Sequence, residues 1–436
     1  MTADNATATD VSTARLDLPD GPIDLPVIVG TEQEHAVDIA ALRAKTGFIT
    51  LDEGYRNTGS VRSDITYIDG EAGVLRYRGY PIDVVCQNAS FIETALLLIH
   101  GELPTKEHME RFSGLLTKHQ MIHESVRQMF DGFPPTAHPM AVLAAMINAT
   151  SCFQPSIMNI DDEETFEETA AMLISKVRTI AAAAYKTSIG HPIMYPDPQL
   201  KYCENFLHMM FSIPLQRLKE PDPDLVEALN LLFILHADHE QNCSTSTVRM
   251  IGSSGANLFA ACSGGVAALW GPLHGGANVA VMNQLNEIHR SDIPTQEYID
   301  NLKKTKGKLF GFGHGVYKAY DPRAQVLKKS ADKVLDKLGV DDPLLDIARE
   351  LEQTALNDEY FVSRNLYPNV DFYSGIIMRA MGIPTNMFTV MFAIGRMPGW
   401  IAHWWEVKRN KSRIYRPRQV YTGPAERDWT PIEKRG

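Results

Sequence analysis

From about residue 90 onwards, the apolar residues of this chain recur at three- and four-residue spacing, the period of an amphipathic or buried helix. The clearest examples are FIETALLLIHG, the 141–151 region and residues 168–185. Another helix is expected in PDPDLVEALNLLFILHADHE, because Asp222 can serve as its N-cap and Pro223 suits its first position. This pattern restricts the chain to a fold whose body is mainly α.

Strand signals are confined to the front of the chain. In DITYIDGEAGVLRYRG (64–79), β-branched and aromatic residues flank Asp69-Gly70, which predicts a hairpin. The N-terminus, MTADNATATDVSTARLD, has neither a basic start nor an apolar core. We therefore expect a flexible polar tail there and no secretory signal.

The charge pattern suggests how the helical body is divided. Residues 286–382 are more charged than their flanks, and helices are expected at 322–338 and 343–356. We interpret the chain as a flexible tail (1–34), a strand-rich segment (35–90), a large helical domain (91–285 and 383–436) and a small helical domain (286–382). Clefts between domains are where ligand sites tend to form.

Composition argues against several classes of function. The formal net charge of −11 disfavours a protein that coats nucleic acid or anionic membrane. The five cysteines are an odd number without C-x-x-C spacing, which disfavours a disulfide framework and favours a reducing compartment. The most apolar stretch, 258–273, is short and interrupted by glycines, so we expect a buried helix and no membrane span.

The motif HADHE (236–240) places His236 and His239 on one face of the expected helix. Its spacing is not H-E-x-x-H and no third ligand is evident, so a hydrogen-bonded pair is favoured over a metal site. A third interpretation is that His239 donates a hydrogen bond to an anionic ligand.

In GPLHGGAN (271–278), His274 stands just before another expected helix. The positive end of the helix dipole disfavours an imidazolium, and a neutral imidazole can donate a hydrogen bond to a carbonyl oxygen. The alternative is a capping or turn histidine. The glycine pair favours a functional role, because it lets a ligand approach the backbone closely.

The stretch GFGHGVYKAYDPRA (311–324) surrounds His314 with glycines but is not a dinucleotide fingerprint, since Val316 stands where the third glycine would be. Asp321 can cap the helix that Pro322 begins, which puts Arg323 in its first turn. Arg323 is then either exposed to solvent or paired with a carboxylate ligand.

Three further segments carry candidate site residues. Asp371 stands at an expected helix start, where a plain N-cap is the alternative to a functional role. Arg396 lies inside an apolar segment (388–405), so its charge needs an anion. The basic stretch KRNKSRIYRPRQ (408–419), which contains Arg416, is interpreted as a solvated or subunit-contacting arm.

Together these residues suit a small di-anionic substrate and proton abstraction next to a carbonyl. Arginines can hold carboxylates in bidentate pairs, while a carboxylate base and histidines move protons. The candidates are one aspartate, three histidines and three arginines: Asp371, His239, His274, His314, Arg323, Arg396 and Arg416.

From about residue 35 to the C-terminus, the sequence resembles citrate synthase, most closely its bacterial hexameric (type II) branch. The motifs that carry the resemblance are LHADHEQNCSTSTVR, LWGPLHGGAN, GFGHGVYKAYDPRA, YPNVDFYSGI and RPRQVYTG, in that order. The resemblance implies a two-lobed helical fold with a small strand-rich N-terminal segment, and condensation of acetyl-CoA with oxaloacetate. It also implies a cytoplasmic enzyme of the tricarboxylic acid cycle.

The resemblance implies a role for each candidate. Asp371 would take a methyl proton from acetyl-CoA, His274 would donate to the thioester oxygen, and His314 would polarise the oxaloacetate carbonyl. Oxaloacetate would be bound by His239, His314, Arg323, Arg396 and, from a neighbouring subunit, Arg416. Coenzyme A would lie against Gly311, Phe312, Gly313, Gly315, Val316 and Lys318.

No metal or permanently bound cofactor is implied, and acetyl-CoA is the cosubstrate. The implied assembly is a homo-oligomer, with a dimer as the minimal active unit and a hexamer as the expected form, and with neither nucleic acid nor membrane as a partner. Closure of the small lobe would bring the two sides of the site together.

Two departures from the family pattern stand out. Gly315 replaces the arginine that usually follows the loop histidine, so we expect altered coenzyme contact or loop mobility. The positions of the tyrosine, arginine and cysteine used for NADH inhibition hold Gln154, Met172 and Leu215, which predicts weak or absent inhibition.

Two rival functions stay open at this point. A 2-methylcitrate synthase would use the same residues with propionyl-CoA, and one methylene in an apolar pocket discriminates by only about 1–3 kcal/mol. A non-catalytic assembly protein would have no need of Asp371, His274 and His314 together.

Overall fold

The structure is a computed structural model that describes residues 12–435 except 159, 217–220, 292 and 339–341. It divides into two compact units. The first consists of Met1–Ser63 with Arg416–Gly436, and the second of Asp64–Tyr415. Each unit is described below by itself.

The first unit contains a small antiparallel sheet of β1 (Thr13–Leu18), β2 (Gly21–Val29) and β3 (His35–Val37), followed by α1 (Leu42–Thr46). A tight turn joins β1 to β2, because Leu18 pairs with Gly21. Ile23, Leu25 and Leu42 form its small core. The C-terminal part adds a single 3-10 turn, η4 (Ile432–Lys434).

The prediction of a flexible tail over residues 1–34 was wrong from Thr13 onwards, because β1 and β2 occupy that region. The missed signal was the alternation in GPIDLPVIV, where buried Ile23 and Leu25 are separated by exposed residues. Residues 1–11 lie outside the described residues.

The second unit begins with the predicted hairpin, which is confirmed. Its strands are β4 (Thr66–Asp69) and β5 (Val74–Tyr77), and β6 (Tyr80–Pro81) extends the sheet. Asp69 pairs with Val74, so residues 70–73 make a four-residue turn in place of a tight Asp-Gly turn.

Beyond the hairpin the second unit is helical, which confirms the mainly α fold. Its long helices, of ten residues or more, are α3 (Phe91–His100), α4 (Lys106–His119), α6 (Pro139–Ser151), α7 (Glu163–Ser188), α8 (Tyr202–Phe211), α9 (Pro223–His236), α10 (Cys243–Ser253), α11 (Leu258–Leu269), α12 (Ala277–Ser291), α13 (Thr295–Thr305), α14 (Pro322–Leu338), α15 (Pro343–Leu356), α17 (Val370–Ala380) and α18 (Phe388–Arg409). Shorter elements are α2 (Ile82–Asn88), α5 (Glu124–Gln128), α16 (Glu359–Val362), η1 (Met129–Gly132), η2 (Pro155–Met158) and η3 (Thr385–Met387).

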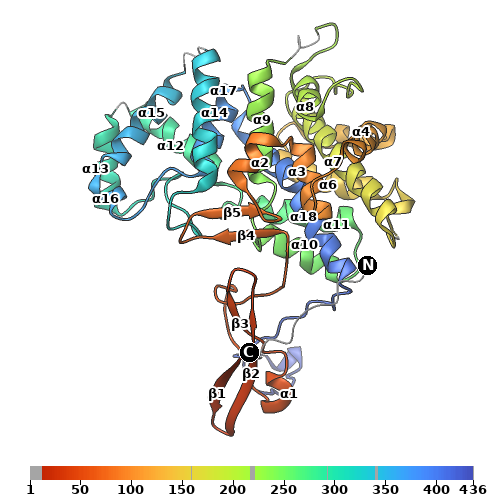
Figure 1. Cartoon of the computed structure of the whole chain (residues 1–436), viewed down its shortest axis with the longest axis vertical. Coiled ribbons are helices and arrows are strands. Elements are labelled where there is room, and N and C mark those ends of the chain that lie inside the picture. The colour runs from red at the N-terminus through yellow and green to blue at the C-terminus, as the bar shows by residue number, and fades with distance from the viewer. Residues whose placement is uncertain (1–11, 159, 217–220, 292, 339–341, 436) are drawn as a thin grey trace. The chain divides into compact units, whose positions relative to one another are not determined.

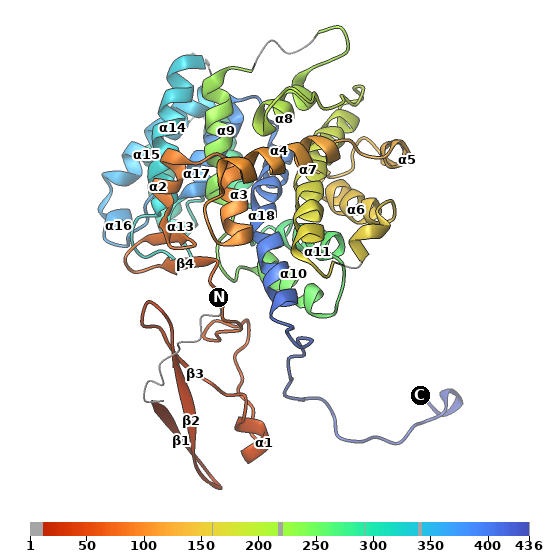
Figure 2. The ribbon, with the colours of Figure 1, turned by 45° about the vertical axis from the view of Figure 1, so that its right-hand side comes forward.

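Helix α18 is the centre of this unit. It contacts α3, α7, α9, α10 and α11, and nearly all of its residues are buried, as its uniformly apolar sequence predicted. Figures 1 and 2 show α12–α17 grouped on one side of the unit, while α4, α6, α7 and α8 lie on the other. Within the described residues, no helix is long and apolar enough to cross a membrane.

The two compact units do not follow the predicted domain boundaries. Residues 35–63 and 416–436 belong to the first unit, whereas the predicted strand-rich segment ran to residue 90 and the large domain to residue 436. The physical reason is that Leu75 and Tyr77 of the second hairpin belong to the buried cluster of the helices, whereas Ile23, Leu25 and Leu42 form a cluster of their own. The small domain at 286–382 stays a prediction, and it coincides with most of the α12–α17 group.

Candidate active site

His239, His314 and Arg323 meet around Tyr317. His239 Nε2 lies 3.2 Å from the Tyr317 hydroxyl, and the rings of His239 and His314 are 5.5 Å apart. Arg323 lies over the Tyr317 ring, and its Nη2 is 3.2 Å from His314 Nε2. Burial and the nearby charge of Arg323 hold the pKa of His239 well below its usual value. These histidines are therefore neutral hydrogen-bonding groups.

His239 was expected on the same helical face as His236, and this was wrong. Helix α9 ends at His236, and His239 lies in the connection to α10. Contacts distant in sequence end the helix there: the Tyr77 hydroxyl bonds the main chain of Ile234 and Asp238, and the Gly399 N–H donates to the Ala237 carbonyl. His236 is left inside, its Nδ1 on the Leu232 carbonyl at 2.7 Å.

Arg323 is held by Asp321, which was predicted only as a helix cap. The Asp321 carboxylate accepts from Arg323 Nε and Nη2, both at 3.0 Å, and also from the Arg323 backbone N–H at 3.0 Å. Both residues are buried. Neither sequence interpretation of Arg323 anticipated this pair, in which a buried guanidinium keeps a counter-ion of its own.

His314 has a defined tautomer. The backbone N–H groups of Val316 and Tyr317 donate to its Nδ1 at 2.9 and 3.2 Å, so the proton of the neutral ring is on Nε2. Burial, with the charge of Arg323, lowers the pKa of His314 to about 4. His314 Nε2 and Arg323 Nη2 are thus two adjacent donors, and an oxygen acceptor from a ligand would satisfy both.

His274 has the opposite tautomer. The Ser244 backbone N–H donates to its Nε2 at 3.2 Å, and the Ser244 hydroxyl lies 2.8 Å from the same atom. The proton is therefore on Nδ1, which leaves that nitrogen as the donor. Burial lowers the pKa of His274 to about 4, with a contribution from Arg396. His274 precedes α12, as predicted.

Arg396 is buried in the middle of α18 and has an unfilled hydrogen-bonding position. Its Nε donates to the His236 carbonyl at 2.6 Å, and its guanidinium lies over the Phe392 ring at 4.9 Å. Its Nη1 is buried and makes no hydrogen bond with any described residue. Burial lowers the pKa of Arg396 to about 10. A buried guanidinium with a free donor is suited to bind an anion.

Asp371 lies in the first turn of α17, but it is not the cap of this helix. The Asn369 side chain accepts from the N–H groups of Asp371 and Phe372 at 3.0 and 3.3 Å. The plain N-cap interpretation of Asp371 is therefore wrong, and its half-buried carboxylate is available. Desolvation raises the pKa of Asp371 to about 6, against a smaller opposite effect of Arg323.

His239, His314 and Arg323 share one electrostatic environment with His274, Arg396 and Asp371. The charges of Arg323 and Arg396 both act on Asp371 and on His239, and Arg396 acts on His274. The Phe392 ring, over which Arg396 lies, has its centroid 4.6 Å from that of His236 and 6.4 Å from that of His274. The fold therefore brings together six of the seven predicted residues.

Arg416 is the exception. It is exposed and belongs to the first compact unit, whereas the other six belong to the second. Its predicted contribution from a neighbouring subunit stays a prediction.

The glycine-rich loop is tied to the start of α17. Gly313 N–H donates to the Tyr367 carbonyl at 2.8 Å, and the Asn369 side chain donates to the Gly313 carbonyl at 2.7 Å. Gly311 and Gly313 have φ of 80° and 75°, which a glycine adopts without strain. Phe312 is buried, whereas Gly315, Val316 and Lys318 are exposed, and Lys318 pairs with Glu71.

Three side chains outside the candidate active site are spaced as metal ligands would be. In the described part of the chain, ligand atoms of His100, His108 and Glu167 lie within 4.8 Å of one another. Arg111 donates to one oxygen of Glu167 at 2.8 Å, and His108 Nε2 lies 2.8 Å from the other. The carboxylate already has a cationic partner, so we assign no metal to this group.

Sequence reasoning missed the residues that hold the candidates in place: Ser244, Tyr317, Asn369 and the Asp321 side chain. Asn369 and Asp321 carried a findable signal, because Asn and Asp before a helix are expected to bond its first N–H groups. Ser244 and Tyr317 had none, since their partners come from other parts of the chain.

The fold and the site together define a class of protein: a mainly helical enzyme equipped for proton transfer on a small anion. The citrate synthase, C-terminal domain family model matches residues 54–418. Citrate synthase 1 of Mycobacterium tuberculosis H37Rv is 53% identical over 426 residues, covering 97% of this chain and 99% of that one. The citrate synthase of Corynebacterium glutamicum is 49% identical over 434 residues, with 98% of each chain covered.

Solved structures of citrate synthases are also similar to this chain. The citrate synthase of Pyrobaculum aerophilum superposes with a TM-score of 0.80 at 34% identity, covering 99% of this chain and all of that one. That of Thermoplasma acidophilum, solved as a ternary complex with carboxymethyl coenzyme A and oxaloacetate, has a TM-score of 0.79 at 31% identity and covers 88% and 100%. This chain belongs to the citrate synthase family and is an acyltransferase, as the resemblance predicted.

Proposed function

We propose that this chain condenses acetyl-CoA with oxaloacetate and hydrolyses the resulting citryl-CoA to citrate and coenzyme A. The observation that carries the proposal is Asp371. It is a carboxylate that the helix does not use as a cap, and its pKa is raised to about 6, which suits a general base near neutral pH. Two neutral histidines with defined donor nitrogens share its surroundings.

The tautomers give each histidine a place in the reaction. Asp371 takes a proton from the methyl group of acetyl-CoA, while Nδ1–H of His274 donates to the thioester oxygen on which charge develops. The resulting enol carbon then attacks the keto carbon of oxaloacetate. Nε2–H of His314 donates to the keto oxygen and protonates the alkoxide that forms. Water then cleaves the thioester.

Arg323, Arg396 and His239 are proposed to hold the carboxylates of oxaloacetate. The support is that Arg396 has a free buried Nη1 and that Arg323 faces His314 Nε2 with a second donor. A dianion placed there would supply the acceptors that these groups lack. The Thermoplasma relative, whose solved complex contains oxaloacetate, is consistent with this assignment.

Coenzyme A is proposed to lie along Gly311, Phe312, Gly313, Gly315, Val316 and Lys318. The exposed Gly315, Val316 and Lys318 could contact it directly, whereas buried Phe312 would fix the loop by packing on Phe361 and Phe372. Closure of the predicted small domain over the large one would exclude water. No metal takes part in this scheme.

The test of the function is thiol release, followed with a disulfide reagent, in the presence of oxaloacetate and either acetyl-CoA or propionyl-CoA. Faster release with acetyl-CoA is the expected result. A preference for propionyl-CoA would make the chain a 2-methylcitrate synthase. The absence of release with both would contradict the enzymatic assignment.

The proposed assembly is a homodimer at least, and a hexamer in its full form, in which Arg416 reaches the oxaloacetate of a neighbouring subunit. Mixing Asp371→Asn with Arg416→Ala subunits tests this. If the site is shared, unfolded and co-refolded mixtures should regain about a quarter of the wild-type activity, because half the random dimers contain one intact site. Activity no higher than that of the separate variants would place Arg416 outside the site.

We also propose that the enzyme works in the cytoplasm, at the entry to the tricarboxylic acid cycle, without control by NADH. Met172 is buried within α7 and Leu215 is fully exposed, and neither side chain can make the charged contacts of an NADH site. Strong inhibition by micromolar NADH would contradict this part of the proposal.

A further inference from the structure

Helix α7 carries a buried arginine, Arg178, that is remote in sequence from every candidate site residue. Its exposed fraction is 3%. Its Nη1 donates to the Tyr202 carbonyl at 3.2 Å and its Nη2 to Gln120 Oε1 at 3.4 Å, both neutral acceptors. Its Nε is buried and has no hydrogen-bond partner among the described residues. The guanidinium lies over the Tyr202 ring at 4.6 Å.

Four arginines are buried in the described part of the chain, and they fall into two kinds. Arg249 is paired with Glu406 and Arg323 with Asp321. Arg396 and Arg178 have no carboxylate within ion-pair distance among the described residues. Arg396 lies among the proposed active-site residues, where a dianionic substrate is expected. By the same reasoning Arg178 lacks an anion, since burial of an unpaired charge is costly.

Arg178 lines a pocket of about 820 Å³, a size suited to a small organic molecule. The pocket is lined by the end of α2, the start of α3, α4, residues 198–203 and α9. Its apolar lining includes Met109, Leu116, Leu200, Val226 and Leu231, and its polar lining includes Lys201 and Glu227. Gln120 and Tyr202, which contact Arg178, also line the pocket and are buried. The pocket thus combines an apolar wall with one buried cationic group.

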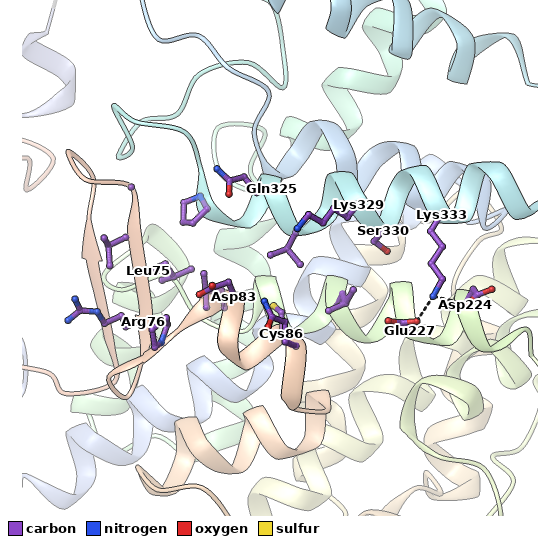
Figure 3. Close-up of a pocket in the computed structure, with 18 residues that line it drawn as sticks. Leu75, Arg76, Asp83, Cys86, Asp224, Glu227, Gln325, Lys329, Ser330 and Lys333 are labelled. Atoms are coloured by element: carbon purple, nitrogen blue, oxygen red, sulfur yellow. Dashed lines mark hydrogen bonds and ion pairs between the residues drawn. The ribbon is translucent and has the colours of Figure 1, made fainter.

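A neighbouring pocket of about 760 Å³ shows the contrast. Figure 3 shows its Lys333 directed towards Glu227, with which it makes an ion pair at 2.8 Å. Lys333 also pairs with Asp224 at 2.9 Å, so this lysine is neutralised by the protein itself. Lys333 therefore needs no anionic ligand, whereas Arg178 has no ion-pair partner among the described residues.

We propose that the pocket lined by Arg178 binds a small amphipathic anion, with its carboxylate or phosphate head on the guanidinium and its apolar body against Met109, Leu116 and Val226. Turned from Gln120 towards the pocket, the guanidinium would present Nε and Nη2 as two adjacent donors for one anionic group. This site is distinct from the proposed active site, which uses none of these residues.

The experiment measures binding of 8-anilinonaphthalene-1-sulfonate by fluorescence, with coenzyme A and oxaloacetate at saturation so that the proposed active site is occupied. Hexanoate and hexyl phosphate should displace the dye, and their ranking identifies the preferred head group. Neutral 1-hexanol, with the same apolar chain, should compete roughly ten-fold less well or worse. Arg178→Met should weaken dye binding by roughly ten-fold or more.

Two further variants separate binding from folding. Arg290→Met removes an exposed arginine of α12 and should leave the dye affinity unchanged. Val226→Phe keeps Arg178 but reduces the volume of the pocket, and it should weaken hexanoate and the dye together. The proposal is overturned if wild type binds no dye under these conditions, if Arg178→Met binds it as tightly as wild type, or if hexanol competes as well as hexanoate.

Discussion

The residues of the candidate active site are held in two different ways. On what we call the helical side, Arg396 lies in the middle of α18 and His274 is bound by Ser244 of α10. On what we call the loop side, His314 lies in the glycine-rich loop, and Arg323 and Asp371 lie in the first turns of α14 and α17. On the helical side, Arg396 is fixed inside α18, and a Cβ at Gly399 would lie 2.3 Å from the Ala237 carbonyl. This close approach leaves little room for movement.

On the loop side, the charged side chains and His314 are held by hydrogen bonds between short segments. Asn369 caps α17 and also bonds the Gly313 carbonyl, and the Val370 N–H donates to Asp321 at 3.3 Å. The Asp321–Arg323 pair, His314 and Asp371 are therefore connected through a few polar contacts. The comparison teaches that a buried side chain can be fixed either by close packing along one helix or by a few hydrogen bonds between separate segments.

The largest expected effect comes from removing the base on the loop side. Asp371→Asn cannot accept a proton, so kcat should fall by about a thousand-fold while the affinity for oxaloacetate, measured by calorimetry, stays close to wild type. Asp346→Asn, which changes an exposed carboxylate in the first turn of α15, is the matched control and should keep full activity. Near-normal turnover of Asp371→Asn would remove the base assignment.

The next effect tests the polar contacts that hold the loop side together. Asp321→Asn leaves Arg323 buried without its counter-ion, so the free energy of unfolding should fall by about 3–5 kcal/mol, measured by urea denaturation. The KM for oxaloacetate should rise as well. The exposed pair Asp336–Arg349 provides the control, since Asp336→Asn should leave stability within error. Equal stability of the two variants would contradict the difference drawn between the pairs.

The pH dependence of kcat/KM distinguishes the proposed base, Asp371, from the proposed donors, His274 and His314. The pKa of Asp371 is raised to about 6, whereas burial lowers the pKa of both His274 and His314 to about 4. The base is ionised above its pKa, so kcat/KM should be flat from pH 8 to about 6.5 and then fall about ten-fold per pH unit below about 6. A decline that begins near pH 7 would instead indicate a histidine with an ordinary pKa.

Ser244→Ala probes the helical side. The variant removes the hydroxyl beside His274 Nε2 but keeps the backbone N–H that fixes the tautomer, so kcat should fall only about ten-fold. The pKa that governs the acidic limb should not move, because Asp371 is unchanged. Ser254→Ala, at an exposed serine, should have no effect. A loss as large as that of Asp371→Asn would show that the hydroxyl itself transfers a proton.

The smallest effect is expected at Gly315, where the family pattern has arginine. A Cβ at Gly315 would meet no atom within 4 Å, so Gly315→Arg should fold normally and change the KM for acetyl-CoA by about three-fold or less. Gly313→Ala is the contrasting variant. Its φ of 75° and a Cβ position 2.8 Å from Leu366 should make it the more damaging of the two. The reverse order would contradict the assigned loop geometry.

Local signals allowed much of the fold to be predicted. The Asp222-Pro223 and Asp321-Pro322 pairs begin α9 and α14 as expected, and α15 has the predicted bounds, because capping depends on residues close in sequence. The end of α9 was wrong because Tyr77 and Gly399, far along the chain, determine it. No local pattern contains that information.

The candidate site shows the same limit. Asp371, His274, His314, Arg323 and Arg396 could be selected by residue type and surroundings, and the fold brings them together. Their hydrogen-bonding states could not be predicted, since the tautomer of His274 depends on Ser244, 30 residues earlier. The contribution of Arg416 from a neighbouring subunit stays a prediction, because Arg416 belongs to the other compact unit.

The most direct test of the central claim, the proposal that Asp371 and His274 together enolise acetyl-CoA, is hydrogen exchange. Acetyl-CoA is incubated in D₂O with the enzyme and 2-hydroxysuccinate, which has a hydroxyl in place of the ketone and cannot condense, and NMR follows the methyl signal. Wild type should exchange the methyl hydrogens, His274→Ala should exchange them much more slowly, and Asp371→Asn should not exchange them. Exchange by Asp371→Asn at the wild-type rate would contradict the account.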